Sequence, residues 1–259
     1  MKKARRQKGF PSIHGLNYLF RMHRPLLTIL FVTCLSLHAE PKGKLLFEDD
    51  FNRDEPNPEK EMVGNGWGTN SRTRAKGQKQ VDLDQGAMHI TMAKVADHGV
   101  SVTQDIAFKD AVIQMRFKLG DKDDLGINIA DMNEKSVHAG HICVARIRPF
   151  QVELTDLKTG NMKLEHREAR KANKATPEMK KLLATKTKRF KNKLSLDSWH
   201  DLEVRIQGHV MTVLIDGSEI GSFESEGIDH ATKSRIRLSV NKEAWVDDVK
   251  VVCGLTLWG

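Results

Sequence analysis

The segment at residues 202–223 reads LEVRIQGHVMTVLIDGSEIGSF and carries the clearest β-strand pattern of the chain. Its first five residues alternate between apolar and charged side chains, which is the pattern of a β-strand with one buried face. The pair Asp216-Gly217 separates two further strand-like runs, and Asp-Gly readily adopts the positive φ angles of a tight turn. Gln207-Gly208 stands in a similar position before Val210. The segment therefore predicts antiparallel strands joined by hairpins.

The same alternation appears elsewhere in the chain, as IQMRFKL in residues 113–119 and IRLSV in residues 236–240. Many short strands of this kind, with few helical patterns, predict an all-β chain in which two antiparallel sheets pack face to face. Residues 40–259 are numerous enough for one large β domain.

One segment, Asn161 to Lys191, lacks the alternation and is rich in Lys, Glu, Ala, Leu and Arg. The stretch Lys163–Lys193 holds twelve basic residues against three acidic ones. Thr176 followed by Pro177 predicts a helix start, with proline at the first helical position, and Asn173 predicts an interruption. We expect a basic helical insertion that projects from the β domain. Its charge fits either a solvated helical face or a site for an anionic surface polymer.

Residues 1–39 carry seven basic residues and no acid, and a short apolar run, Leu26–Leu37, precedes Ala39. A basic region, a short apolar core and a small residue together predict a secretory signal peptide. Residues 40–259 would then form the mature domain, secreted or periplasmic. The apolar run is shorter than the roughly 20 residues of a membrane-spanning helix, so we expect no stable transmembrane segment after cleavage. An N-terminal membrane anchor is the alternative.

Without residues 1–39 the net charge falls from +8 to +1, because 35 basic residues then remain against 34 acidic ones. With a near-neutral mature chain, one Tyr in the whole sequence and no stacking motif, nucleic acid is not an expected partner. Cys143 and Cys253 remain in the mature chain. They fit either a disulfide, which an oxidising compartment permits, or two buried free thiols.

Four pieces of sequence occur in an order typical of one fold family: LLFEDDFN at 45–52 with Gly66-Trp67, WHDLEV at 199–204, VLIDG at 213–217 and VDDVKV at 246–251. In this order the chain resembles the concanavalin A-like jelly-roll superfamily. The resemblance is to family-16 glycoside hydrolases and to 3-keto-disaccharide hydrolase domains, and it covers the mature chain except the insertion. It implies an antiparallel jelly-roll β-sandwich and a carbohydrate or glycan as partner.

The family-16 resemblance implies a catalytic strand of the form Glu-x-Asp-x-Glu or Glu-x-Asp-x-x-Glu, and this chain lacks one. The nearest segment is LGINIAD at 125–131, in which Gly126 replaces the first Glu and Asn128 replaces the Asp. Retaining glycosidases need two carboxyl groups about 5 Å apart. The family's fold is therefore expected here without its double-displacement chemistry.

The 3-keto-disaccharide hydrolase resemblance rests on FQVELTD at 150–156, followed by Thr159-Gly160. It implies Glu153 and Asp156 as candidate catalytic carboxylates. Residues three apart on a regular strand point to opposite faces, and surface acids beside a basic insertion are the alternative interpretation. The Asn-Ser-Gly landmark of those domains is absent.

Candidate ligand-binding residues are Trp67, His141, Arg146 and Arg148. Trp67, like Trp245, could stack on a sugar ring if exposed, whereas a sandwich more often buries tryptophan. His138 and His141 have a spacing that suits a metal but no third ligand nearby in sequence. Arg146 and Arg148 share one face of a predicted strand, where they could bind a carboxylate or sulfate, or simply face solvent.

A structural calcium ion is implied by the resemblance of VDDVKV to the closing strand of family-16 proteins, in which an Asp helps to hold the metal. This places Asp247 at the ligand position, with Asp50 of the opening strand as its partner. Alternation puts Asp247 on the core side, where an ionised carboxylate needs a metal or a counter-ion. Pairing with a nearby Arg or Lys is the alternative.

Three functions follow from these observations. The first is an exported carbohydrate-recognition domain, not catalytic by the family-16 route. The second is a hydrolase of 3-keto-disaccharides or related glycosides. The third is a structural or adhesion module whose basic insertion holds an anionic surface polymer.

Overall fold

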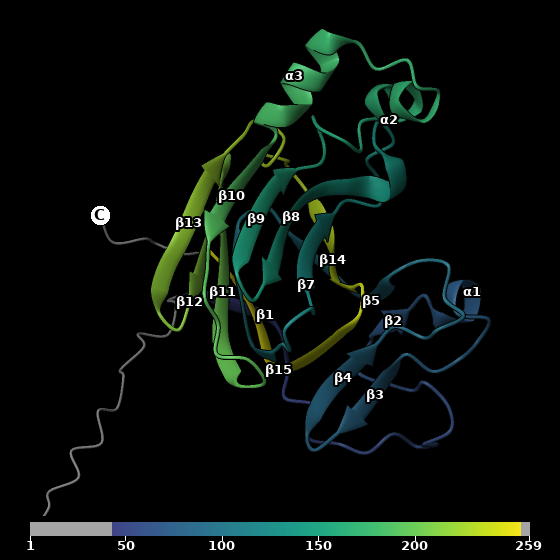
Figure 1. Cartoon of the computed structure of the whole chain (residues 1–259). Helices are drawn as coiled ribbons and strands as arrows, with labels where there is room; N and C mark the ends of the chain where they lie inside the picture. Colours follow the sequence, from purple (N-terminus) through teal and green to yellow (C-terminus); the bar gives the residue numbers. More distant parts are fainter. Residues whose placement is uncertain (1–42, 255–259) are drawn as a thin grey trace, which may run out of the picture. The chain divides into compact units, whose positions relative to one another are not determined.

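A computed structural model of the chain describes residues 43–254, all within one compact unit. The predicted signal peptide, residues 1–39, lies outside the described residues. The described part is a sandwich of two antiparallel sheets, with few helices (Figure 1). The predicted all-β class is therefore confirmed. Cys143 and Cys253 are both free thiols.

The eight-stranded sheet has the order β13-β12-β11-β6-β15-β4-β3, with β1 paired to β15 beside this path. Its strands are β1 Lys44–Asp49, β3 Val81–Asp84, β4 Ala87–Thr91, β6 Ala111–Lys118, β11 Trp199–Gln207, β12 Val210–Ile215, β13 Ser218–Glu224 and β15 Glu243–Cys253.

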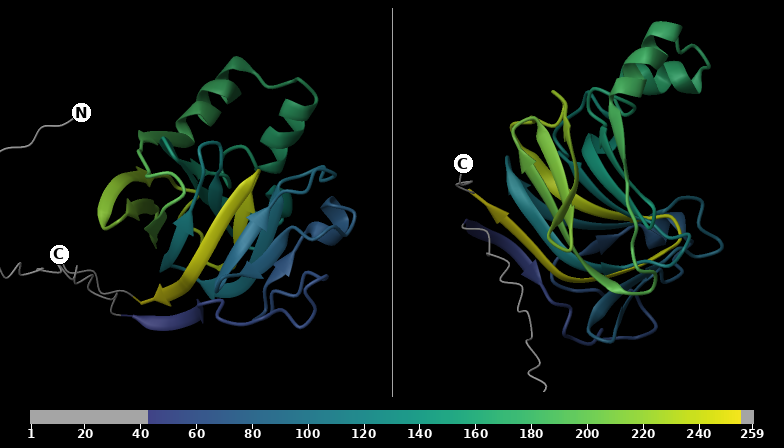
Figure 2. Two further views of the ribbon diagram at one scale, coloured as in Figure 1. Left: turned by 60° about the horizontal axis from the view of Figure 1, so that its bottom comes forward. Right: turned by 60° about the vertical axis from the view of Figure 1, so that its left-hand side comes forward.

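The seven-stranded sheet has the order β10-β9-β8-β7-β14-β5-β2. Its strands are β2 Gly68–Thr69, β5 Val100–Phe108, β7 Leu125–Ala130, β8 His141–Arg148, β9 Gln151–Asp156, β10 Thr187–Lys191 and β14 Lys233–Val240. The helices are α1 Ser71–Arg74, the 3-10 turn η1 His138–Gly140, α2 Leu164–Lys171 and α3 Pro177–Thr185. Both sheets curve, as the right-hand view of Figure 2 shows.

The core lies between the sheets and consists of alternate residues of each strand. Ile113, Met115 and Phe117 of β6 are buried, and Ile236 and Leu238 of β14 are buried from the other side. Each fully buried apolar side chain contributes roughly 1.5–3 kcal/mol. The alternation that predicted the strands is thus the burial pattern of the sandwich.

The two predicted hairpin turns are confirmed. Asp216 and Gly217 have φ angles of +50° and +75° and join β12 to β13, whose register pairs Ile215 with Ser218. Gly208, at φ +53°, lies between β11 and β12, where Gln207 pairs with Val210. These turns set the register of the three strands at one edge of the eight-stranded sheet.

The predicted insertion is helical only in part. Its helices α2 and α3 form an arm that projects from one end of the sandwich (Figure 1), and the Thr176 side chain caps α3 by accepting a 3.2 Å hydrogen bond from the Met179 amide. Asn173, at φ +55°, breaks the helix as expected. The end of the predicted insertion, however, is strand β10, which pairs with β9 at the edge of the seven-stranded sheet. Neither of these helices, nor any other within residues 43–254, has the length and apolar character of a membrane-crossing helix.

Strand β10 belongs to the sandwich because its side chains pack there. Phe190 lies against Gly221 of β13 so closely that a Cβ at Gly221 would meet the Phe190 ring at 2.3 Å. An exposed, lysine-rich edge strand protects a sheet from pairing with other chains, and TKRFK fits that role.

We predict that replacing only the arm, Leu164–Thr185, by a short Gly-Ser linker leaves a cooperatively folded sandwich. Most of the arm is exposed, and changing loop length costs only about 0.6 kcal/mol per doubling. The longer deletion from Asn161 to Lys191 removes β10, and we expect it to lower the thermal midpoint. Circular dichroism melting of both variants is the measurement, and a non-cooperative melt of the shorter deletion would contradict the assignment.

A second prediction concerns His200 on β11, which ties the β12–β13 turn to the sheet. Its Nδ1 lies 2.7 Å from Asp216 Oδ2, and its Nε2 lies 3.0 Å from the Ser195 carbonyl. Burial alone lowers the pKa of His200, but the hydrogen bonds to Asp216 and Ser195 outweigh burial and raise that pKa above its usual value.

The stabilisation by His200 is therefore fully present below the unfolded-state pKa of about 6.5 and is lost as the pH rises through the raised folded-state pKa. Urea unfolding at pH values on both sides of about 6.5 should show the wild type losing stability relative to His200→Gln as the pH rises. Parallel pH profiles for the two proteins would contradict this linkage.

Candidate functional site

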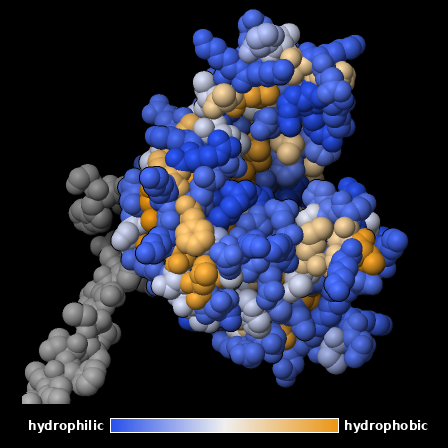
Figure 3. Space-filling model, viewed as in Figure 1, coloured by the Kyte–Doolittle hydropathy of each residue, from blue (hydrophilic) through white to orange (hydrophobic). Residues whose placement is uncertain are grey.

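The outer face of the seven-stranded sheet is hollowed into a groove of about 590 Å³. Asn70, Arg74 and His98 line it at one end, and His138, Asn161 and Met162 line it toward the helical arm. The visible lining of the hollow below the helices is hydrophilic (Figure 3). Among the described residues that line the groove there is no Trp, Phe or Tyr.

The floor of the groove consists of two rows of side chains that cross the strands. Their order follows from the antiparallel register. One row runs through Arg189, Glu153, Arg146, Gly126, Ser239 and Ser101, and the next runs through Thr187, Thr155, Val144, Asn128, Arg237 and Thr103. Thr187 and Arg189 come from β10, so the end of the predicted insertion supplies part of the floor.

Arg146, a predicted ligand-binding residue, lies in the first row. It forms an ion pair with Asp124 and donates a 3.1 Å hydrogen bond to Ser239 Oγ. A Cβ at Gly126 would lie 2.3 Å from Ser239 Oγ and 3.0 Å from Arg146 Nη2. Gly126 thus makes room for the guanidinium, at the position where the family-16 resemblance expects a catalytic Glu.

Glu153 also lies in the first row and is the single carboxylate among the described residues that line the groove. Arg189 forms an ion pair with it at 2.7 Å. Asp156 points the other way and is fully buried. It accepts hydrogen bonds from the Thr159 amide at 2.9 Å, Ser225 Oγ at 2.6 Å and the Gly227 amide at 3.1 Å. The structure therefore does not bring the two candidate carboxylates together.

Arg237, in the second row, was not singled out from the sequence although the alternation in residues 236–240 places it on the outer face. Its side chain is buried, with the residue only 8 % exposed. Nη2 donates to the Ala139 carbonyl at 2.7 Å and to Met132 Sδ at 3.2 Å, and Nη1 lies 3.1 Å from His141 Nδ1. Burial, followed by the nearby Arg235, lowers the pKa of Arg237 to about 10, so it stays charged at neutral pH.

His141 lines the groove as predicted and lies between Arg237 and Asn128, whose Oδ1 is 2.9 Å from His141 Nδ1. Burial, followed by the charge of Arg237, lowers the pKa of His141 to about 3, and the ring is neutral at physiological pH. The rings of His138 and His141 are 6.3 Å apart. No group of three or more His, Cys, Asp or Glu among residues 43–254 could hold a metal ion.

The other two predicted ligand-binding residues lie outside the groove. Arg148 lies further along β8 and lines a separate hollow of about 480 Å³. The prediction that Trp67 binds a ligand was wrong. Trp67 packs in the core against Phe47 and Phe51, and its Nε1 donates a hydrogen bond to Asp49 Oδ2 at 2.8 Å. It is therefore not available to stack on a sugar. Trp245 lies on the outer face of the eight-stranded sheet, stacked on His89.

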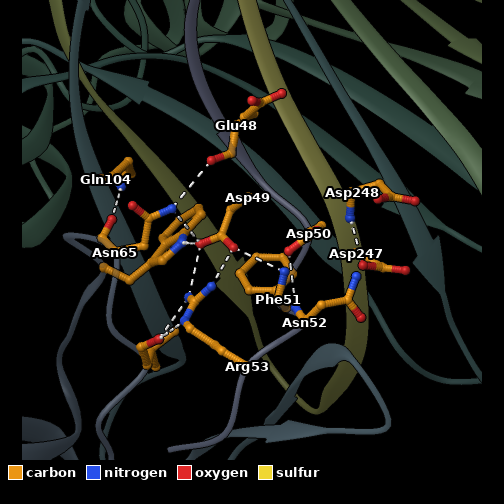
Figure 4. Close-up of polar contacts among 12 residues, drawn as sticks. Glu48, Asp49, Asp50, Phe51, Asn52, Arg53, Asn65, Gln104, Asp247 and Asp248 are labelled. Carbon is orange, nitrogen blue, oxygen red and sulfur yellow. Dashed lines mark hydrogen bonds and ion pairs between the residues drawn. The ribbon is translucent and has the colours of Figure 1, made fainter.

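At the predicted calcium site, the carboxylates form ion pairs and hydrogen bonds with other residues of the chain (Figure 4). Asp49 is buried and binds the Arg53 guanidinium through both oxygens, at 2.6 and 2.9 Å, and also accepts from Asn65 and Trp67. Burial raises the pKa of Asp49, but these hydrogen bonds outweigh it and hold that pKa below its usual value. The Arg53 guanidinium thus supplies the positive charge beside the opening strand.

Asp247 is not on the core side, because a β-bulge at Asp247–Asp248 shifts the register of β15, with Asp248 at φ +49°. Asp247 instead pairs with Arg116 at 3.2 Å, which is the alternative that the sequence left open. Asp50 is exposed and accepts from the Asn52 amide. The ion pairs of Asp49 and Asp247 therefore favour the counter-ion alternative over a calcium ion at Asp247 and Asp50.

We therefore predict that thermal unfolding of the wild type has the same midpoint in calcium and in a chelator. Arg53→Ala should destabilise by roughly 3 kcal/mol, because it leaves Asp49 buried without a counter-ion. The matched control Arg116→Ala breaks a more exposed pair and should cost about 1 kcal/mol or less. A calcium-dependent midpoint that disappears in Asp247→Asn would contradict this reading and establish the metal site at Asp247 and Asp50.

Comparison with known proteins finds similar folds among solved structures. No family model matches the chain, and no curated protein matches it. Among solved structures, a laminarinase from Rhodothermus marinus is similar, with a TM-score of 0.54 and 12% identity over 82% of this chain and 98% of that one. A laminarinase from Flavobacterium has a TM-score of 0.51 and 14% identity over 81% and 100%. A Bacillus subtilis protein of unknown function with a galectin-like fold has a TM-score of 0.54 and 12% identity over 83% and 99%.

These likenesses show that the chain has the concanavalin A-like jelly-roll fold, as the sequence predicted. At such low identity they establish the fold alone, so function has to be argued from the groove itself.

Proposed function

We propose that this chain is an exported carbohydrate-binding domain that holds a glycan in the groove of the seven-stranded sheet. The observation that carries the proposal is the lining: amide, hydroxyl and guanidinium groups on rigid strands, many fixed by hydrogen bonds to one another. Sugar hydroxyls are recognised by such preorganised polar groups. Similarity to glycan-acting proteins in fold supports the same class of ligand, and the basic and apolar pattern of residues 1–39 supports export.

We favour glycan binding over hydrolysis by the double-displacement route. That reaction requires two carboxyl groups about 5 Å apart, whereas the groove lining offers Glu153 alone, in an ion pair with Arg189. The exposure of Glu153 to the groove is also the one observation that favours the second candidate, a hydrolase of 3-keto-disaccharides or related glycosides.

The test combines glycan binding with turnover. Purified protein is screened against neutral and acidic polysaccharides by affinity electrophoresis, and hits are measured by titration calorimetry and by product analysis. We expect binding that is lost in Thr187→Trp, which fills the groove at its β10 side. The matched control Thr212→Trp, on the outer face of the eight-stranded sheet, should bind normally.

We also expect no hydrolysis with net retention at the anomeric carbon. Turnover that Glu153→Gln abolishes while binding persists would replace the binding-domain proposal by the hydrolase. Equal binding by both tryptophan variants would show that the glycan lies elsewhere.

A further inference from the structure

One arginine of the groove has no carboxylate partner. Three of its four arginines have a carboxylate partner: Arg146 pairs with Asp124, Arg189 pairs with Glu153 at 2.7 Å, and Arg74 lies 3.7 Å from Asp97. Arg237, the most deeply buried of the four, has no carboxylate within ion-pair distance among residues 43–254. Its hydrogen-bond partners are a carbonyl, a thioether and an imidazole.

The surroundings of Arg237 do not supply the missing charge. His141 is neutral at physiological pH, since burial lowers its pKa to about 3, and Asn128 is uncharged. Asp105, on the neighbouring strand β5, attracts Arg237 only at longer range, because Arg235 binds both of its oxygens. A buried charge without a counter-ion is costly, and an arginine cannot relieve that cost by losing its proton.

Arg237 also retains unused donors. The contacts described above occupy at most three of the five guanidinium N–H groups that arginine carries. Nε of Arg237 has no hydrogen-bond partner, and no fully buried side-chain nitrogen among the described residues lacks one, so Nε keeps contact with solvent. Because Arg237 lines the groove, that solvent is the groove itself.

We propose that the groove binds an acidic glycan and that Arg237 is the residue that receives the negatively charged group of the sugar, a carboxylate or a sulfate. The inference rests on the proposed carbohydrate-binding function and names its ligand class. Planar arginine groups bind such anions through paired N–H donors. Asn128 and Ser239 lie beside Arg237 in the groove and offer partners for neighbouring hydroxyls.

The helical arm gives independent support for an extended anionic ligand. The groove ends at Asn161 and Met162, next to the start of α2. Arg167 Nη2 of α2 lies 3.5 Å from His138 Nε2 at the groove end, and the arm, Leu164–Thr185, holds six basic residues against three acidic ones. Cationic groups therefore continue from the groove onto the arm, which suits a polymer with repeated charges.

The experiment measures calorimetric binding of two matched pairs of probes at physiological salt. Polygalacturonate and its methyl ester differ in carboxylate charge, and κ-carrageenan and agarose differ in sulfate. We expect the acidic member of at least one pair to bind, and which pair responds distinguishes a carboxylate from a sulfate. Arg237→Met should weaken that binding at least about tenfold, and Arg237→Lys should weaken it less.

Arg205→Met is the matched control, since Arg205 lies on the eight-stranded sheet and pairs with Glu203, and it should bind like the wild type. Thermal melting gives a second readout. Removing an uncompensated buried charge should leave the midpoint of Arg237→Met unchanged or raise it, whereas a purely structural role would lower it.

Neutral probes that bind as well as acidic ones, with Thr187→Trp still blocking them, would overturn the acidic ligand and leave the binding function standing. Acidic probes that bind equally to Arg237→Met but fail with the arm deleted would move the anion site to the arm. Failure of every probe to bind would count against both proposals.

Discussion

The constraint on which the structure depends is the burial of alternate side chains between two curved sheets. Once Ile236 and Leu238 enter the core of the seven-stranded sheet, Arg237 and Ser239 must face outward into its hollow. A shift of one residue in β14 would exchange the two sets and would bury arginine between the sheets. The apolar core therefore fixes which polar groups form the groove and how they are ordered across it.

The charges that this order creates have the opposite sign to those of a retaining glycosidase. Such enzymes place two carboxylates about 5 Å apart, where they stabilise an oxocarbenium-like transition state that carries positive charge. In this groove Arg146 crosses over Gly126, and Arg237 lies one row away. Guanidinium groups at these positions would oppose a developing cation and attract an anion. The groove is thus suited to holding a charged ligand and poorly suited to that reaction.

The sequence was informative where local pattern and tertiary burial agree, and less so where they conflict. Period two identified the strands, and Asp216-Gly217 identified a hairpin, because both signals are local. Residues 187–191 carry the lysine-rich composition of the preceding helices, so only pairing with β9 shows that they form an edge strand. The bulge at Asp247–Asp248 leaves no trace in the alternation of neighbouring residues, and it moved Asp247 out of the core. Arg237 could be placed on the outer face from sequence, but its lack of a counter-ion depends on contacts between distant strands.

Three other buried charges in the described part of the chain are compensated in one of two ways. Asp49 and Asp124 have arginine partners. Lys233, fully buried, donates to the carbonyls of Lys109 and His230, and burial lowers its pKa, which makes loss of its proton less costly. Arg237 has neither route, because its partners are neutral and its guanidinium keeps its charge. Violations of such a physical rule are expected at functional or strained sites, and the anionic ligand proposed for the groove would supply the charge that Arg237 lacks.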